Sequence, residues 1–294
     1  LRSFISFLEE RNQLVRIKEP VTWDLEITEI ADRQIRAEGP ALLFENVDGH
    51  EFPVLINLYG SAQRVAWSLG VNKVEELSER VRSLLDMTKG PPQGFVNKLS
   101  ALGNLAKIAR YQPKLIKKAP CQDVVITGDE VDLFKFPILR CWPLDGGRTI
   151  TFPLVITKNP MTGKRNVGTY RMQVYDKRTT GMHWQTHKVG AEHYRRSTES
   201  GLKRMDVAVA IGVDPTTVWT GSAPLPPEMD EMQISGFIRE RGVDMVKCVS
   251  VDLEVPAYSE IVLEGYVELG ELRDEGPFAV SYTHLRAHET EADL

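Results

Sequence analysis

The sequence predicts an α+β protein of two domains, with helices concentrated in the first third and strands in the remainder. Its 294 residues suffice for two ordinary domains, since domains typically contain roughly 100–200 residues. A Gly-Pro-Pro-Gln-Gly stretch at 90–94 interrupts the first pattern, strand signals dominate from Val124 onward, and we place the boundary near residue 118. Many antiparallel-looking strands with few helices between them favour a partly closed barrel for the second domain.

The first domain, residues 1–118, alternates amphipathic helices with short strands. Leu1, Phe4, Ile5 and Leu8 recur at helical spacing, and Asp48-Gly49 is a strong hairpin-turn signal. In order, the expected elements are a helix at 1–13, a strand at 14–17, a helix at 25–37, strands at 41–47 and 52–59, helices at 61–69 and 73–87 with caps at Ser61 and Asn72, and a helical Lys-rich segment up to 118.

The second domain, residues 119–278, is expected to consist mainly of strands. The predicted strands are 123–128, 149–157, 167–175, 181–186, 206–212, 244–251 and 259–269, with helical interruptions near 188–198 and 228–240. The chain contains no internal repeat and no Gly-rich phosphate loop, so a nucleotide cofactor would have to be held in another way.

The composition is that of a soluble globular protein and argues against several classes. No run approaches the roughly 20 apolar residues of a transmembrane helix, and a net charge of −5 gives no general reason to expect nucleic-acid binding. The basic run at 107–118 is interpreted as a solvated helix face. The three cysteines are far apart without paired spacing, which disfavours disulfides and zinc and suits the cytoplasm. The chain starts at Leu1 without a signal-peptide pattern, as expected for a fragment.

Residues 166–187 form a predicted hairpin with an unusual number of ligand-type side chains. Arg171 lies inside a strand, where a permanent charge needs either a structural ion pair or an anion such as a substrate carboxylate, and both alternatives stay open. His183 and His187 are four residues apart, but spacing alone favours ordinary histidines over metal ligands. Glu275 precedes Gly-Pro-Phe, a rigid turn that suits a held carboxylate, although most acidic turns are merely solvated.

Several long motifs in a fixed order resemble the UbiD family of prenylated-flavin-dependent decarboxylases. They cover nearly everything from Leu1 to Phe278 and read LVRIKEPV, EITEIADR, GPALLFENV, NVGTYRMQV, GMHWQTHKVGAEHY, VAVAIGVDP, VKCVSVDLEVPAYSEIVLEGY and EGPF. The resemblance implies that the second domain is a split β-barrel that binds prenylated FMN, whose phosphate is bridged to Mn²⁺ or Mg²⁺ beside K⁺. An amide, an imidazole and a carboxylate suit such a metal.

The resemblance also assigns site residues. The implied metal ligands are Asn166, His187 and Glu231, and the residues implied to line the cofactor are Thr169, Tyr170, Arg171, His183, Trp184, Gln185 and Lys188. Arg171 and Glu275 resemble the arginine and first carboxylate of the family's acid–arginine–acid network. The family's proton donor falls five residues after the first carboxylate, where this chain has Val280, and valine cannot transfer a proton.

The expected activity is non-oxidative, reversible decarboxylation of an aromatic or α,β-unsaturated acid, with a 4-hydroxybenzoate-type precursor of ubiquinone or menaquinone as the default substrate. Residues 279–294 lack the family's strand pattern and are interpreted as a non-native tail, with the C-terminal oligomerisation domain missing and this chain therefore inactive. The expected partners of the parent are a flavin prenyltransferase that supplies the cofactor and further copies of itself. The alternatives are a non-catalytic flavin- or metal-binding module and, ranked last, a flavin reductase, because no nicotinamide site is evident.

Overall fold

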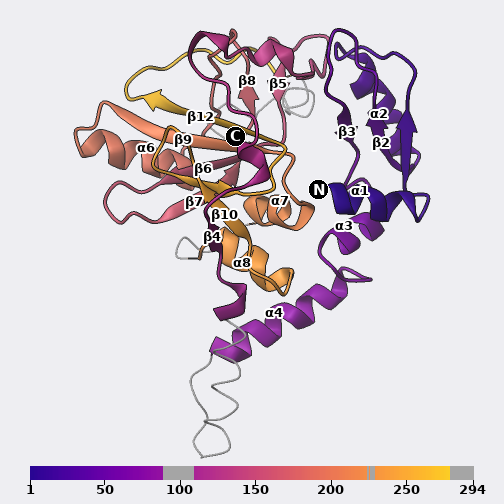
Figure 1. Ribbon diagram of the computed structural model, residues 1–294, viewed down its shortest axis with the longest axis horizontal. Helices are drawn as coiled ribbons and strands as arrows, with labels where there is room; N and C mark the ends of the chain where they lie inside the picture. Colours follow the sequence, from indigo (N-terminus) through magenta and orange to yellow (C-terminus); the bar gives the residue numbers. More distant parts are fainter. Residues whose placement is uncertain (89–108, 224, 226–228, 279–294) are drawn as a thin grey trace, which may run out of the picture.

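The computed structural model describes residues 1–88, 109–223, 225 and 229–278. The predicted tail at 279–294 and the proton-donor position at Val280 lie outside these residues. Figure 1 shows the N-terminal sheet with α1 and α2 on one side of the molecule and a larger β-rich region on the other. The α+β class predicted from the sequence is confirmed.

The N-terminal region is a three-stranded sheet in the order β1-β2-β3, flanked by two helices. Its elements are α1 (Arg2–Glu9), β1 (Leu14–Ile17), α2 (Glu26–Arg36), β2 (Ala41–Phe44) and β3 (Val54–Ile56). β1 and β2 are parallel because α2 provides the crossover between them, whereas β2 and β3 are antiparallel. Gly49 adopts a positive φ of 74° in the connecting turn, as its place after Asp48 predicted.

Two further helices, α3 (Ala62–Ser68) and α4 (Glu75–Thr88), connect this region to the rest of the chain. Ser61 caps α3 as predicted, because its side chain accepts a hydrogen bond from the Arg64 N–H. Leu69 and Leu77 share an apolar cluster with Phe237 and Ile238, which belong to α8 (Glu231–Ile238). The N-terminal helices therefore share a core with an element from the other half of the chain.

The β-rich region is organised around an antiparallel sheet in the order β12-β9-β6-β7. Its strands are β6 (Leu154–Lys158), β7 (Arg165–Thr169), β9 (Arg204–Ile211) and β12 (Ile261–Glu268). Leu154, Val155 and Ile156 are all fully buried, and they face alternately into two different apolar clusters. The sheet is thus covered on both faces in its centre.

Smaller elements surround this sheet. They are β4 (Lys114–Ile116), β10 (Asp244–Lys247) and β11 (Glu254–Pro256) in one sheet, β5 (Thr149–Ile150) and β8 (Met172–Gln173) in another, the helices α6 (Val189–Glu199) and α7 (Pro215–Ser222), and the 3₁₀ turns η1 (Pro120–Gln122), η2 (Gly128–Glu130) and η3 (Leu133–Lys135). No helix within the described ranges is long and apolar enough to cross a membrane.

The structure differs from the sequence expectations at four places. Residues 181–186, predicted as a strand, form an irregular segment that leads into the turn before α6. Residues 123–128 form no strand, and Val124, Val125 and Ile126 are exposed by 78%, 52% and 45%. Lys114–Ile116 is not helical but forms β4, which pairs in parallel with β10. α7 was not predicted, although Asp214 caps it and Pro215 occupies its first turn, both of which are helix-start signals.

Candidate functional site

Arg171 and Glu275 form a bidentate ion pair at the start of β8. Arg171 Nε donates to Glu275 Oε1 at 2.8 Å, and Arg171 Nη2 donates to Oε2 at 3.0 Å. His183 Nδ1 lies 2.6 Å from the same Oε2 atom. The side chains of Arg171 and Glu275 are only 24% and 21% exposed, which makes a paired guanidinium and carboxylate a partly buried charge cluster.

Hydrogen bonds of the backbone, to other backbone groups and to the Gln173 side chain, position the segments that carry these three residues. β8 pairs with β5, and on its other side the His183 N–H donates to the Arg171 carbonyl. The segment that carries Glu275 is fixed by a Gly276 N–H donated to Gln173 Oε1 at 2.7 Å and a Gly146 N–H donated to the Pro277 carbonyl at 2.9 Å.

Gly146 and Gly276 pack backbone against backbone. A Cβ atom on Gly146 would lie 2.4 Å from the Gly276 Cα. The Asp-Gly-Gly run at 145–147 is therefore needed for close approach as well as for turning, and together with Gln173 it was missed by the sequence reasoning. The placement of Gln173 two residues after Arg171 on a strand was the available signal, because such residues share a face.

The environment of Glu275 keeps it ionised. Burial raises the pKa of this carboxyl, but the hydrogen bonds from His183 and Arg171 and the Arg171 charge outweigh burial and lower the pKa to about 2. At neutral pH Glu275 therefore acts as a fixed anion that orients Arg171 rather than as a proton donor.

A second cluster joins β7 to the first turn of α8. Glu231 Oε2 accepts a hydrogen bond of 3.2 Å from the Val167 N–H, immediately after Asn166 in β7. Asn166 is 6% exposed, and within the described residues its Nδ2 atom makes no well-aligned hydrogen bond, although the amide lies close enough to the Tyr170 hydroxyl to lower the pKa of that phenol. Burial raises the pKa of Glu231 to about 7. Asn166 can offer a cation only its Oδ1 oxygen, and Glu231 adds a buried carboxylate, so this pair of oxygen donors fits a divalent cation.

The start of α6 lies next to this pair. The Gly190 N–H points to the Tyr170 hydroxyl at 3.4 Å, and burial raises the pKa of Tyr170. A Cβ atom on Gly190 would lie 2.7 Å from Trp184 Nε1, so the glycine allows the indole to pack on the helix. Trp184 Nε1 is buried without an acceptor in the described part of the chain. A helix N-terminus beside an unsatisfied N–H is suited to an anion.

The remaining predicted residues lie around this helix start or on β7. Thr169 Oγ1 lies 3.0 Å from Ser222 Oγ, which adds Ser222 as a contact that the sequence reasoning missed. Gln185 is partly buried, and its carbonyl accepts from the Lys188 N–H. His187 is exposed in the turn before α6, and no contact within the described ranges joins its ring to Asn166 or Glu231. The structure thus places Glu231 against the backbone next to Asn166, whereas it does not bring His187 into contact with either residue.

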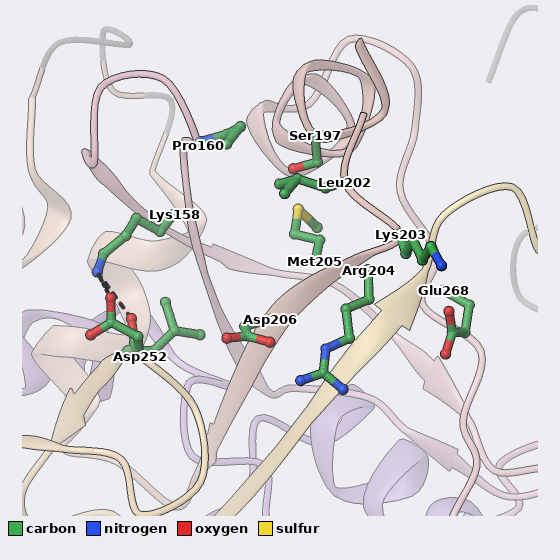
Figure 2. A pocket seen from close by; sticks show the side chains of 11 residues that line it. Lys158, Pro160, Ser197, Leu202, Lys203, Arg204, Met205, Asp206, Asp252 and Glu268 are labelled. Atoms are coloured by element: carbon green, nitrogen blue, oxygen red, sulfur yellow. Dashed lines mark hydrogen bonds and ion pairs between the residues drawn. The ribbon is translucent and has the colours of Figure 1, made fainter. Parts of the chain in front are cut away.

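A surface hollow of about 670 Å³ lies elsewhere, at the C-terminal end of α6 and the start of β9, and contains none of the predicted site residues. Figure 2 shows its lining side chains, which include Ser197, Met205 and Arg204. Lys158 at its rim donates to Asp252 Oδ2 at 2.9 Å. Because its cations and acids are mixed, the hollow has no charge preference that would select a ligand.

Family comparisons cover both regions of the chain. Residues 5–83 match the model of the 3-octaprenyl-4-hydroxybenzoate carboxy-lyase N-terminal domain, UbiD_N. Residues 114–292 match the model of the 3-octaprenyl-4-hydroxybenzoate carboxy-lyase Rift-related domain, UbiD.

The curated relatives are considerably longer than this chain. A protein of Archaeoglobus fulgidus is 49% identical over 278 residues, which are 95% of this chain and 56% of that protein. A protein of Aquifex aeolicus is 48% identical over 281 residues, which are 95% of this chain and 57% of that protein. This chain therefore spans little more than half the length of the curated relatives that it matches.

Solved structures with the same fold include two enzymes. The UbiD-class enzyme HmfF from Pelotomaculum thermopropionicum, in complex with FMN, matches with a TM-score of 0.78 and 29% identity over 94% of this chain and 57% of the enzyme. Vanillic acid decarboxylase from Sedimentibacter hydroxybenzoicus, in a closed form, matches with a TM-score of 0.79 and 28% identity over 94% of this chain and 56% of the enzyme. An evolved dimeric HmfF in complex with prFMN matches with a TM-score of 0.78 and 28% identity, over 94% and 59% of the two chains.

Proposed function

This chain belongs to the UbiD family, and from that membership we propose that its parent protein is a carboxy-lyase that decarboxylates an aromatic or α,β-unsaturated acid with prenylated FMN. The observation that carries the proposal is the partly buried Arg171–Glu275 pair with His183 on the same carboxylate. A guanidinium held in a fixed orientation is suited to bind a substrate carboxylate through paired hydrogen bonds. Arg171 would orient that carboxylate, and Glu275 would keep the guanidinium in place.

The cofactor is supported by the helix start and by the solved relatives with FMN and prFMN. When bound, prenylated FMN would supply an electron sink for the electron pair left behind by CO₂. We assign Thr169, Tyr170, Arg171, His183, Trp184, Gln185 and Lys188 to its surroundings. The N-terminus of α6 and Trp184 Nε1 are suited to the phosphate, because both present N–H groups to an anion.

A divalent metal, Mn²⁺ or Mg²⁺, fits the pair of Asn166 and Glu231, with exposed His187 as the third ligand. The described residues contain no group of three or more His, Cys, Asp and Glu side chains arranged for a metal, so the amide of Asn166 is essential to this assignment. Binding of a cation would stabilise the ionised form of Glu231, which burial disfavours in the metal-free chain. A K⁺ ion beside this metal is part of the same proposal.

We further interpret the four-stranded sheet and the small sheets beside it as the split β-barrel of the family. The same proposal places the domains at 1–118 and 119–278 and the protein in the cytoplasm. It also holds that the parent is a homo-oligomer whose cofactor is supplied by a flavin prenyltransferase. The evolved dimeric form of HmfF supports the oligomer. A 4-hydroxybenzoate-type acid on the route to ubiquinone or menaquinone fits the family description, and vanillic acid decarboxylase supports the wider aromatic class.

The second candidate is a non-catalytic flavin- or metal-binding module. It is favoured by Val280, which stands where the family has its proton donor, because valine cannot transfer a proton.

The deciding experiment uses the parent protein co-expressed with a flavin prenyltransferase and measures CO₂ release from 4-hydroxybenzoate, vanillate and cinnamate. The enzyme releases CO₂ from at least one acid, and Arg171→Met abolishes release while retaining bound flavin. Arg178→Met is the matched control, since Arg178 forms an exposed pair with Asp129. A protein that binds flavin and Mn²⁺ but releases no CO₂ from any such acid would be the non-catalytic module.

A further inference from the structure

Arg165 lies beside the proposed metal pair and connects three elements. It is the first residue of β7, immediately before Asn166, and its side chain is only 15% exposed. Its Nη2 atom donates to Asp230 Oδ2 at 2.7 Å, and its Nη1 atom donates to Glu254 Oε2 at 3.1 Å. One guanidinium therefore connects β7 to the start of α8 and to β11.

Asp230 also fixes the start of α8 through a second contact. Its Oδ1 atom accepts from the Met232 N–H at 2.9 Å and thereby caps α8. One oxygen of the same carboxylate thus fixes the helix, while the other fixes Arg165. Glu231, the next residue, reaches back to the Val167 N–H. Residues 165 and 167 of one strand therefore hold residues 230 and 231, with Asn166 between them.

The small contribution that these ion pairs make to folding stability argues for another role. Arg165 Nε is buried without an acceptor among the described residues. The Asp230 and Glu254 side chains are 27% and 39% exposed, so solvent screens both ion pairs and each adds little to stability. A pair that fixes the relative position of two ligands has a different benefit, because metal affinity depends on ligands that are already in place.

We propose that Arg165, acting through Asp230, is a positioning residue that holds the Glu231 carboxylate against Asn166 for a divalent cation. This inference rests on the proposed function, because it presupposes the metal at Asn166 and Glu231. Among the described residues, Arg165 forms no hydrogen bond or ion pair with either proposed ligand side chain, although its charge favours the ionised form of Glu231. It acts on the backbone position from which Glu231 extends.

The test measures Mn²⁺ affinity of the purified chain by electron paramagnetic resonance, from the signal of free Mn²⁺ during titration. Arg165→Met raises the dissociation constant by roughly tenfold or more, as loss of a residue behind a metal ligand typically does. Arg165→Lys recovers part of the affinity, because a single ammonium can bond Asp230 or Glu254 but lacks the planar fork.

Asp230→Asn provides a variant that preserves the helix cap. Asparagine still accepts from the Met232 N–H, but its amide lacks the charge that bonds Arg165. It is expected to weaken Mn²⁺ binding severalfold without loss of the folded state, and the double variant Arg165→Met/Asp230→Asn is expected to be no weaker than Arg165→Met alone. This non-additivity distinguishes a joint positioning role from two separate effects on stability.

Arg140→Met is the matched control. Arg140 donates to Asp24 Oδ1 at 3.3 Å in another partly buried ion pair, but neither residue lies on α8 or next to a proposed ligand in the chain. Its affinity for Mn²⁺ should equal that of the wild type. If Asp230→Asn and a folded Arg165→Met bind Mn²⁺ as tightly as the wild type, the inference is wrong and the metal site stands. If the wild-type chain binds no Mn²⁺, the metal site and the inference are both wrong.

Discussion

Arg171 and Glu275 lie 104 residues apart in the chain, yet they share two hydrogen bonds of 2.8 and 3.0 Å. The pair ties the segment after β12 to the start of β8. His183 bonds one oxygen of the same carboxylate, so the segment from Arg171 to His183 holds Glu275 from two points.

Replacement of Glu275 should change stability in a pH-dependent way. Because the folded-state pKa of Glu275 is lowered from 4.5 to about 2, its stabilisation is fully present above pH 4.5 and is lost as the pH falls towards 2. We expect Glu275→Gln to reduce the free energy of unfolding by about 1–3 kcal/mol at neutral pH. Urea denaturation should show this difference narrowing below pH 4.5. Asp129→Asn, at a fully exposed carboxylate, should show no such trend.

Removal of His183 should raise the pKa of Glu275. The His183 hydrogen bond is the largest of the contacts that lower this pKa, and leucine cannot replace its N–H donor. The titration of the Glu275 carboxyl carbon, followed by NMR and assigned with Glu275→Gln, should move to higher pH in His183→Leu. An unchanged titration would mean that Arg171 alone keeps Glu275 ionised.

Glu231→Gln should stabilise the metal-free chain at alkaline pH. The folded-state pKa of Glu231 is raised from 4.5 to about 7, so its contribution is present below pH 4.5 and is lost as the pH rises through 7. In EDTA near pH 8, the variant should therefore be more stable than the wild type by about 1–3 kcal/mol, with no difference near pH 4. Addition of Mn²⁺ should stabilise the wild type only. A wild type that is less stable than the variant under all these conditions would contradict a metal ligand at Glu231.

Gly146→Ala should displace the Glu275 segment. The added Cβ would lie 2.4 Å from the Gly276 Cα, and backbone atoms cannot move aside as the end of a side chain can. Hydrogen exchange of the Gly276 N–H should accelerate, and flavin retention should fall. Gly265→Ala is the control, because no atom lies within 4 Å of its Cβ position. Equal exchange in both variants would indicate that the close approach is not needed.

Thr157→Val should weaken the attachment of α6 to the sheet. Thr157 Oγ1 lies 2.8 Å from His193 Nδ1, and both residues are buried. Valine has the same shape but leaves the imidazole nitrogen unsatisfied, so the free energy of unfolding should fall by about 1–3 kcal/mol. Thermal denaturation of Thr157→Val and of the wild type would measure this loss of stability. Thr162→Val, at an exposed position, is the control. Equal melting temperatures would show that His193 finds another partner.

Local patterns predicted the elements whose residues alternate or recur regularly. The strand at 14–17 and the helix after Leu25 were both correct, because their apolar residues pack into the N-terminal clusters: Leu14 into one, and Ile17, Ile27 and Ile30 into the other. Residues 123–128 look like a strand by composition, but Val124 and its neighbours stay exposed, so β-branched side chains alone do not specify a strand. β4 was taken for helix because its pairing with β10, far along the chain, overrides local preference.

The site was less accessible to local reasoning. Asn166 and Glu231 are separated by long stretches of chain, and neither has a distinctive neighbour pattern. Only the resemblance to a family linked them, whereas the Val167–Glu231 hydrogen bond brings them together in space. Arg171 is different, since a charge inside an apolar strand demanded a partner, and the sequence left open whether that partner was a protein carboxylate or a ligand. The structure shows that Arg171 pairs with a protein carboxylate, that of Glu275.

The eight residues of α8 connect the candidate metal site to the N-terminal region. Glu231 lies at one end of the helix, and at the other end Phe237 and Ile238 are packed among Leu69, Val71 and Leu77. A version of the chain that starts after the N-terminal helices would expose this apolar end of α8 to water and remove the packing that fixes the helix. Residues of the N-terminal region thus help to fix the helix that carries the Glu231 carboxylate, through packing at the opposite end of that helix.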